Sequence, residues 1–133
     1  MLMFFATVNK PRQLLYLSFI GRVSVEQLQQ GREDIVLLLA DLQSGFRVLA
    51  DLSRLDSMDT SCATEIGEVM ELCEQKGVGL VIRIVPDPAK DIGLNILTLL
   101  HYRRRPRIIT CSSLAEAEDA LQLQTHAGFK DST

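Results

Sequence analysis

Three consecutive polar residues, Asp59, Thr60 and Ser61, stand directly before a segment with helical periodicity. Each is a good N-cap residue, because its side chain can accept a hydrogen bond from a free N–H group of the first helical turn. A helix needs one cap, so we expect one of the three to cap it and the others to be surplus. A serine at a helix N-terminus also suits a phosphate, since free N–H groups and the helix dipole stabilise negative charge. The surplus hydroxyl groups therefore indicate a functional site.

The helix that follows, expected from about Cys62 to Lys76, has an apolar face and an acidic arc opposite to it. At about 100° per residue, four glutamates spread over that arc, and none has a basic partner four residues later. A solvated outer face is the ordinary explanation. Four like charges repel one another, however, which favours a basic partner surface. The four residues are Glu65, Glu68, Glu71 and Glu74.

The elements that position these residues alternate between strands and helices, in the order β-β-α-β-α-β-α-β-α. Two capping boxes, Ser24 to Gln27 and Ser113 to Glu116, start the first and last helices. After an opening hairpin, strict alternation predicts parallel strands with right-handed crossovers. The fold class is therefore α/β, with helices packed on a mixed, mostly parallel sheet. The expected strands are 3–8, 14–20, 46–52, 80–85 and 107–111, and the expected helices are 24–42, 62–76, 89–103 and 113–123.

Length and composition indicate one globular domain over residues 1–133, with 124–133 as a frayed tail. Hydrophobic residues make up 47% of the chain and charged residues 23%, which excludes a disordered tail or a coiled coil. The net charge of -3 and the absence of Trp argue against a nucleic-acid partner. No apolar run is long enough for a transmembrane segment. Three cysteines without a C-x-x-C pair argue against a disulfide framework and structural zinc, and indicate reduced thiols in a cytoplasmic protein.

From Phe46 to about Leu121 the chain resembles a STAS domain, the module of anti-sigma factor antagonists and of the cytoplasmic tails of sulfate transporters. The matching stretches are the strand 47–52, the helix start 58–61, the sequence GVGLVI at 77–82 and the sequence SSLAEAEDAL at 112–121. In that family the loop before the helix typically reads Asp-Ser-Ser/Thr-Gly, and a partner kinase phosphorylates its second hydroxyl residue. Carried over by position, the phosphoacceptor is Ser61. The chain departs from the pattern at Cys62, where the family usually has Gly.

The resemblance implies a non-catalytic bacterial signalling domain that regulates transcription by binding a protein partner, an anti-sigma factor with serine kinase activity. No cofactor or metal is expected. Unphosphorylated Ser61 and the acidic helix would dock on the partner. A phosphate on Ser61 would add about -1.5 to -2 charge at this contact and weaken the binding. The oligomeric state stays open, a homodimer included. The expected partner-binding residues are Asp59, Thr60, Ser61, Glu65 and Glu68.

The densest basic patch offers an alternative function that would not need Ser61. It consists of Arg103, Arg104, Arg105 and Arg107. Cations are favoured at a helix C-terminus, which is the ordinary explanation. The alternative is a STAS scaffold without phosphorylation that binds an anion, a nucleotide or a lipid through these arginines.

Two other classes of protein fit the sequence poorly. A receiver domain with Asp51 as phosphoacceptor would need an acidic pair after the first strand and a late lysine, and the chain has neither. A hydrolase would need a nucleophile, and no recognisable nucleophile motif accompanies His101 and His126 in the sequence.

Overall fold

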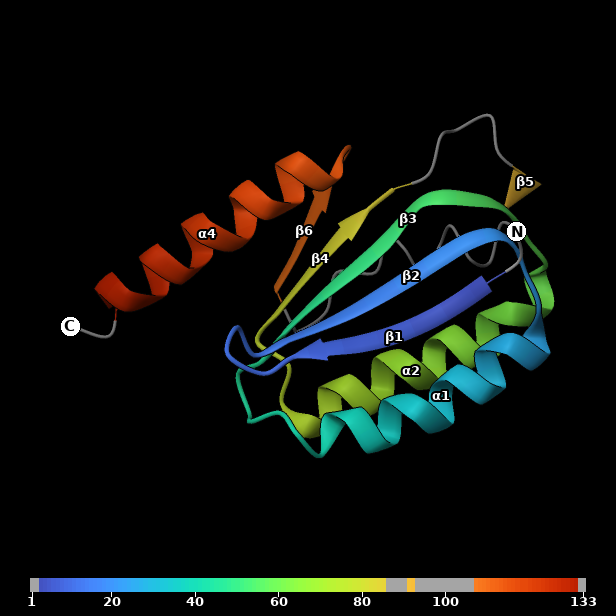
Figure 1. The fold of residues 1–133 in the computed structure, drawn as a ribbon, viewed down its shortest axis with the longest axis horizontal. Coiled ribbons are helices and arrows are strands. Elements are labelled where there is room, and N and C mark those ends of the chain that lie inside the picture. Colours follow the sequence, from blue (N-terminus) through green and yellow to red (C-terminus); the bar gives the residue numbers. More distant parts are fainter. Residues whose placement is uncertain (1–2, 86–90, 93–106, 132–133) are drawn as a thin grey trace.

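The computed structural model describes residues 3–85, 91–92 and 107–131 (Figure 1). Their strands form one mixed sheet in the order β1-β2-β3-β4-β6, with β5 paired to β3. β1 and β2 form an antiparallel hairpin, and all other strand pairs are parallel. The strands are β1 (Met3–Asn9), β2 (Leu14–Val23), β3 (Arg47–Met58), β4 (Leu80–Ile84), β5 (Asp91–Ile92) and β6 (Arg107–Cys111).

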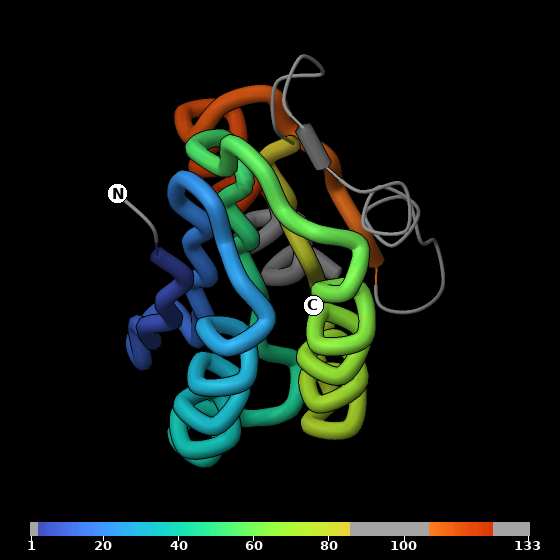
Figure 2. Tube along the Cα trace, turned by 90° about the vertical axis from the view of Figure 1, so that its right-hand side faces the viewer, coloured from blue at the N-terminus to red at the C-terminus, as the bar shows by residue number. Residues whose placement is uncertain are grey.

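Helices cover both faces of the sheet. α1 (Val25–Leu39) and α2 (Ala63–Lys76) lie side by side beneath one face, and α4 (Leu114–Asp131) crosses the opposite face over β4 and β6 (Figures 1 and 2). A short 3-10 helix, η1 (Thr60–Cys62), leads into α2. The core accordingly has two layers. The larger, between the sheet and α1 and α2, includes Leu15, Leu52 and Ile35, and the smaller, beneath α4, includes Leu49 and Leu121.

The predicted α/β class, the hairpin and the first capping box are confirmed. The Ser24 hydroxyl accepts a hydrogen bond from the Gln27 N–H, and the Gln27 side chain accepts one from the Ser24 N–H. At the end of α2, Gly77 takes the left-handed conformation with φ 97°, as expected of a helix stop. In the second predicted box the Ser113 hydroxyl accepts from the Glu116 N–H, whereas the Glu116 carboxylate accepts from Ser112.

Several predicted boundaries are wrong. α1 ends at Leu39 rather than Leu42, since the chain turns there and buries Leu42 in the larger core layer. α4 continues to Asp131 rather than ending near Leu123, and no proline interrupts it. Residues 91–92 form β5 within the predicted helix 89–103, because they pair with the end of β3. The rest of that predicted helix lies outside the described residues.

The most consequential difference is the length of β3, which continues from Leu52 to Met58 through a segment predicted to be a loop. β3 stays paired to β2 across two register shifts, and at each shift β3 uses one more residue than β2. Such bulges bend a strand and redirect its side chains. The Asp51 carboxylate accepts hydrogen bonds from the N–H and hydroxyl of Ser53 at the first shift. The bent end of β3 leads through η1 into α2 (Figure 1).

Candidate functional site

The Ser61 turn, residues 59–61, lies between the end of β3 and the start of α2, and all three of its side chains are exposed. It forms one wall of a polar depression of about 610 Å³. The opposite wall is the end of β2 and its connection to α1. The depression is lined by Arg22, Val23, Ser24, Val25, Glu26, Ser57, Met58, Asp59, Thr60 and Ser61. The predicted site residues Asp59, Thr60 and Ser61 are thus brought together on one surface.

None of the three side chains of the Ser61 turn caps a helix, so the predicted side-chain cap is wrong. Asp59 precedes η1 and Cys62 precedes α2, and neither makes a side-chain cap hydrogen bond. The backbone provides the bond instead, because the Cys62 N–H donates to the Asp59 carbonyl at 2.9 Å. A 3-10 turn that enters a helix in this way can satisfy N–H groups without a side chain. The Ser61 hydroxyl is therefore not occupied by capping.

Cys62, at the position where STAS domains usually have glycine, points into the core. Its side chain is fully buried and its thiol lies 3.7 Å from the carbonyl oxygen of Val23 on β2. Burial raises the pKa of this thiol, as do the nearby carboxylates of Asp59, Glu26 and Glu65. The cysteine therefore leaves the approach to Ser61 open, and it holds the end of β2 against η1.

Replacement of Cys62 by Ala is expected to lower the free energy of unfolding by about 1 kcal/mol, because it removes a fully buried sulfur atom from this contact. Urea denaturation measures the change. Thr60→Ala, at an exposed neighbouring position, is the control and should stay within about 0.5 kcal/mol of wild type. Equal denaturation midpoints for Cys62→Ala and wild type would contradict the described packing.

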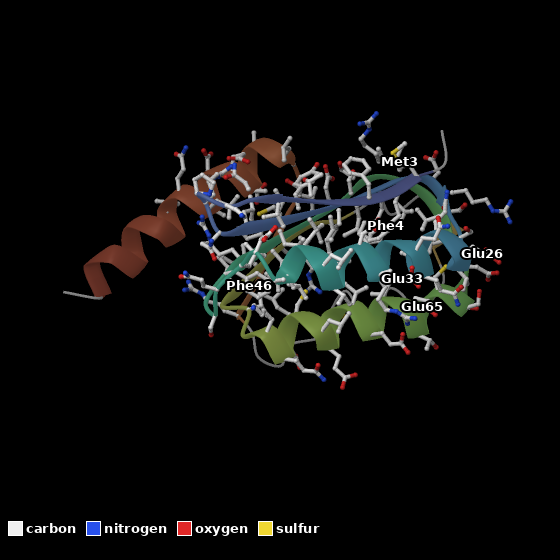
Figure 3. All side chains as sticks on the ribbon, turned by 60° about the horizontal axis from the view of Figure 1, so that its bottom comes forward. Met3, Phe4, Glu26, Glu33, Phe46 and Glu65 are labelled. Atoms are coloured by element: carbon white, nitrogen blue, oxygen red, sulfur yellow. The ribbon has the colours of Figure 1, made fainter. Side chains whose placement is uncertain are left out.

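The prediction that Glu65 lies on the exposed acidic arc of α2, opposite its apolar face, is wrong. The Glu65 side chain is buried between α2 and α1 (Figure 3), where its carboxylate accepts hydrogen bonds from Arg32 at 2.8 Å and Gln29 at 3.3 Å. Arg32 also forms an ion pair with Glu68, which remains exposed. The basic partner sits on the neighbouring helix, and the periodicity of one helix contains no information about such a partner. Glu71 and Glu74 are exposed as predicted.

Sequence reasoning missed Arg22, because it ended the second strand at Ile20. β2 instead runs to Val23, and Arg22 pairs in register with Ser57 on β3. Its exposed side chain lines the polar depression opposite the Ser61 turn. The β-branched residues Ile20 and Val23 are a weak signal that could have extended the strand.

Asp51 is buried in the sheet, and its carboxylate accepts hydrogen bonds from Tyr16 and Ser53. Burial and the neighbouring Asp51 charge raise the pKa of Tyr16. This network stabilises the bend in β3.

The predicted anion-binding patch falls largely outside the described residues, which include Arg107 but not Arg103, Arg104 or Arg105. Arg107 is exposed at the start of β6. Within residues 3–85, 91–92 and 107–131, no three His, Cys, Asp or Glu side chains are grouped to hold a metal ion. No helix in the same ranges is both long and apolar enough to cross a membrane.

The strand order, the two helical layers and the turn from β3 into α2 define a STAS-like domain, which confirms the resemblance at the level of the fold. Among solved structures, the chain is similar to the anti-sigma factor antagonist SpoIIAA in its unphosphorylated form, with 18% identity and a TM-score of 0.59 over 90% of this chain and 97% of that one. It is also similar to an uncharacterised DUF3478-family protein with a SpoIIAA-like fold from Shewanella loihica PV-4. There the identity is 16% and the TM-score 0.63, over 89% of this chain and 91% of that one. No protein-family model and no curated protein matches the sequence.

Proposed function

We propose that this chain is a non-catalytic regulatory module that docks on a protein partner through the Ser61 turn and is switched by phosphorylation of Ser61. The partner class is an anti-sigma factor with serine kinase activity, and the setting is the bacterial cytoplasm. The fold shared with the anti-sigma factor antagonist SpoIIAA supports a regulatory scaffold of this kind.

The observation that carries the proposal is the state of Ser61. Its side chain is exposed in a polar depression, and no hydrogen bond among the described residues engages its hydroxyl group. The neighbouring Cys62 is turned inward and does not cover it. A hydroxyl in this position is accessible both to a phosphate donor and to a docking partner.

Electrostatics supports a switch at this position. Asp59 and Glu26 line the same depression, so a phosphate of about -1.5 to -2 charge would enter an acidic setting. A partner that binds the neutral Ser61 hydroxyl would then face added negative charge. The contact would also lose the hydrogen-bond donor that the hydroxyl group provides. Asp59, Thr60, Ser61 and the exposed Glu68 form the proposed contact surface. Glu65 contributes indirectly, because it holds Arg32 beside Glu68.

Kinase labelling tests the modification. The purified chain would be incubated with ATP and each of a panel of bacterial anti-sigma serine kinases, and its intact mass measured. One added phosphate is expected on wild type and on Thr60→Ala, and none on Ser61→Ala. A phosphate that persists in Ser61→Ala would place the modification elsewhere and contradict the assignment.

Binding tests the switch. With the kinase that labels the chain, Ser61→Asp is expected to bind at least about tenfold more weakly than wild type, because a permanent charge replaces the hydroxyl group. Ser61→Ala should bind within about threefold of wild type, since it adds no charge. Titration calorimetry measures both constants. Equal affinities for Ser61→Asp and Ser61→Ala would overturn the electrostatic switch.

A further inference from the structure

The polar depression beside Ser61 contains one basic side chain among the residues that the structure describes, that of Arg22. It is exposed, and no ion pair or hydrogen bond of its guanidinium group with another described residue is present. The other charged residues of the depression are Glu26 and Asp59. The depression is therefore acidic overall but holds a single cation without a fixed partner.

The backbone holds Arg22 close to the Ser61 turn. Arg22 pairs with Ser57, and the next residue, Val23, pairs with Met58 immediately before the turn. The Val23 carbonyl oxygen also lies 3.7 Å from the thiol of Cys62, the residue that follows Ser61. The strand end that carries Arg22 is thus fixed to both sides of the turn, and Arg22 and Ser61 line the same depression.

The chemistry of a phosphoserine matches this cation. A phosphate group presents three acceptor oxygens, and a guanidinium group donates N–H groups in a planar fork that binds two of them. Without such a cation, the charged side chains that line the depression around the phosphate would be those of Glu26 and Asp59. With it, one of the phosphate charges is neutralised within the chain.

We propose that Arg22 is the internal counter-ion of phosphorylated Ser61. On phosphorylation its guanidinium group binds the phosphate across the depression and closes the surface that the unmodified turn offers to a partner. This inference rests on the proposed function, since it concerns the phosphorylated form. It adds a residue on β2 to the switch, which the loop motif alone does not contain.

The test measures the second pKa of the phosphate, which is ordinarily near 6. Phosphoserine is inserted at position 61 during translation, so no kinase is needed, and the ³¹P chemical shift is followed against pH. A neighbouring cation favours the dianion and lowers this pKa. The phosphate pKa is therefore expected to be about 0.5–1 unit higher in Arg22→Gln than in wild type.

Two control variants decide whether the effect belongs to Arg22. Arg54→Gln removes an equal charge from an exposed position outside the lining of the depression and should leave the phosphate pKa within about 0.2 units of wild type. Glu26→Gln removes a carboxylate from the depression and should lower it. Indistinguishable titrations of Arg22→Gln and Arg54→Gln would overturn the inference.

A second measurement uses the wild-type sequence and needs no arginine variant. In the phosphorylated chain, the Arg22 Nε–H resonance should move with the same midpoint as the phosphate titration, whereas the Arg54 Nε–H resonance should not. An Arg22 resonance that ignores the titration would equally overturn the inference. Because the phosphoserine is inserted during translation and needs no kinase, the proposed function and this inference fail separately. Absent kinase labelling defeats the proposed function, and a phosphate pKa that is unchanged in Arg22→Gln defeats the inference.

Discussion

Replacement of Arg32 by Ala is expected to lower the free energy of unfolding by about 2–3 kcal/mol. The substitution leaves the Glu65 carboxylate buried between α1 and α2 without its cation, and an uncompensated buried charge is costly. The Arg32 side chain is 32% exposed, so water screens part of the effect and the loss falls below that of a fully buried pair. Urea denaturation followed by circular dichroism measures the change.

Two control variants separate the buried pair from the exposed one. Glu68→Gln removes the other partner of Arg32, whose side chain is 46% exposed, and should cost no more than about 0.5 kcal/mol. The double substitution Arg32→Met with Glu65→Leu removes both members of the buried pair and should recover most of the stability lost in Arg32→Ala. If Arg32→Ala unfolds at the wild-type midpoint, the described pairing makes no net contribution.

Replacement of Gly31 by Ala is expected to lower the free energy of unfolding by about 1–2 kcal/mol. A methyl group at this position of α1 would collide with the ring of Phe4 on β1, which packs against Phe19 with ring centroids 4.8 Å apart. The ring must move within a packed layer, and overpacking of this kind typically costs about 1–3 kcal/mol. The higher helix propensity of alanine offsets up to about 1 kcal/mol of that cost.

Gly67 provides the matched control, because it lies within α2 and a methyl group there would meet nothing within 4 Å. Gly67→Ala should therefore raise the free energy of unfolding by about 0.5–1 kcal/mol through helix propensity alone. The same chemical change is thus expected to have opposite signs in the two adjacent helices. A stabilised Gly31→Ala variant would show that β1 is not packed on α1 as described.

Local sequence patterns predicted most of the fold because the patterns and the tertiary structure agree. The hairpin, the Ser24 capping box and the Gly77 stop are each determined by residues a few positions apart. The buried strand around Val48 and the strand at Leu80 also follow from short apolar runs between turn residues. These features depend little on distant parts of the chain.

The sequence did not predict that β3 continues beyond Leu52, because the apolar residues of this segment are spaced by three. Leu52, Leu55 and Met58 all face the core layer of α1 and α2, whereas a regular strand would direct every second residue to that face. Each of the two register shifts adds one residue and so restores the facing of the next apolar side chain. A spacing of three resembles a helix or a loop in the sequence alone, and only the pairing with β2 explains it.

Only the contiguous part of the candidate site follows directly from the sequence. Asp59, Thr60 and Ser61 are neighbours in sequence and form one exposed turn. Glu65 was misplaced because its partner Arg32 is 33 residues away on another helix. Arg22 was missed for the same reason, since only its pairing with Ser57 on β3 places it in the wall of the depression opposite the Ser61 turn. Contacts between elements distant in sequence are what local patterns omit.

The rate at which each of the three buried thiols is alkylated measures how often its part of the structure opens locally. Cys62, Cys73 and Cys111 lie at the start of α2, near its end and at the end of β6. Burial raises the pKa of each, that of Cys73 to about 12, so the native thiols react slowly and modification waits for an opening event. The alkylation rate of each cysteine thus reports how often its own segment becomes exposed. The alkylation rate of Cys62 reports how often the start of α2, next to Ser61, opens locally.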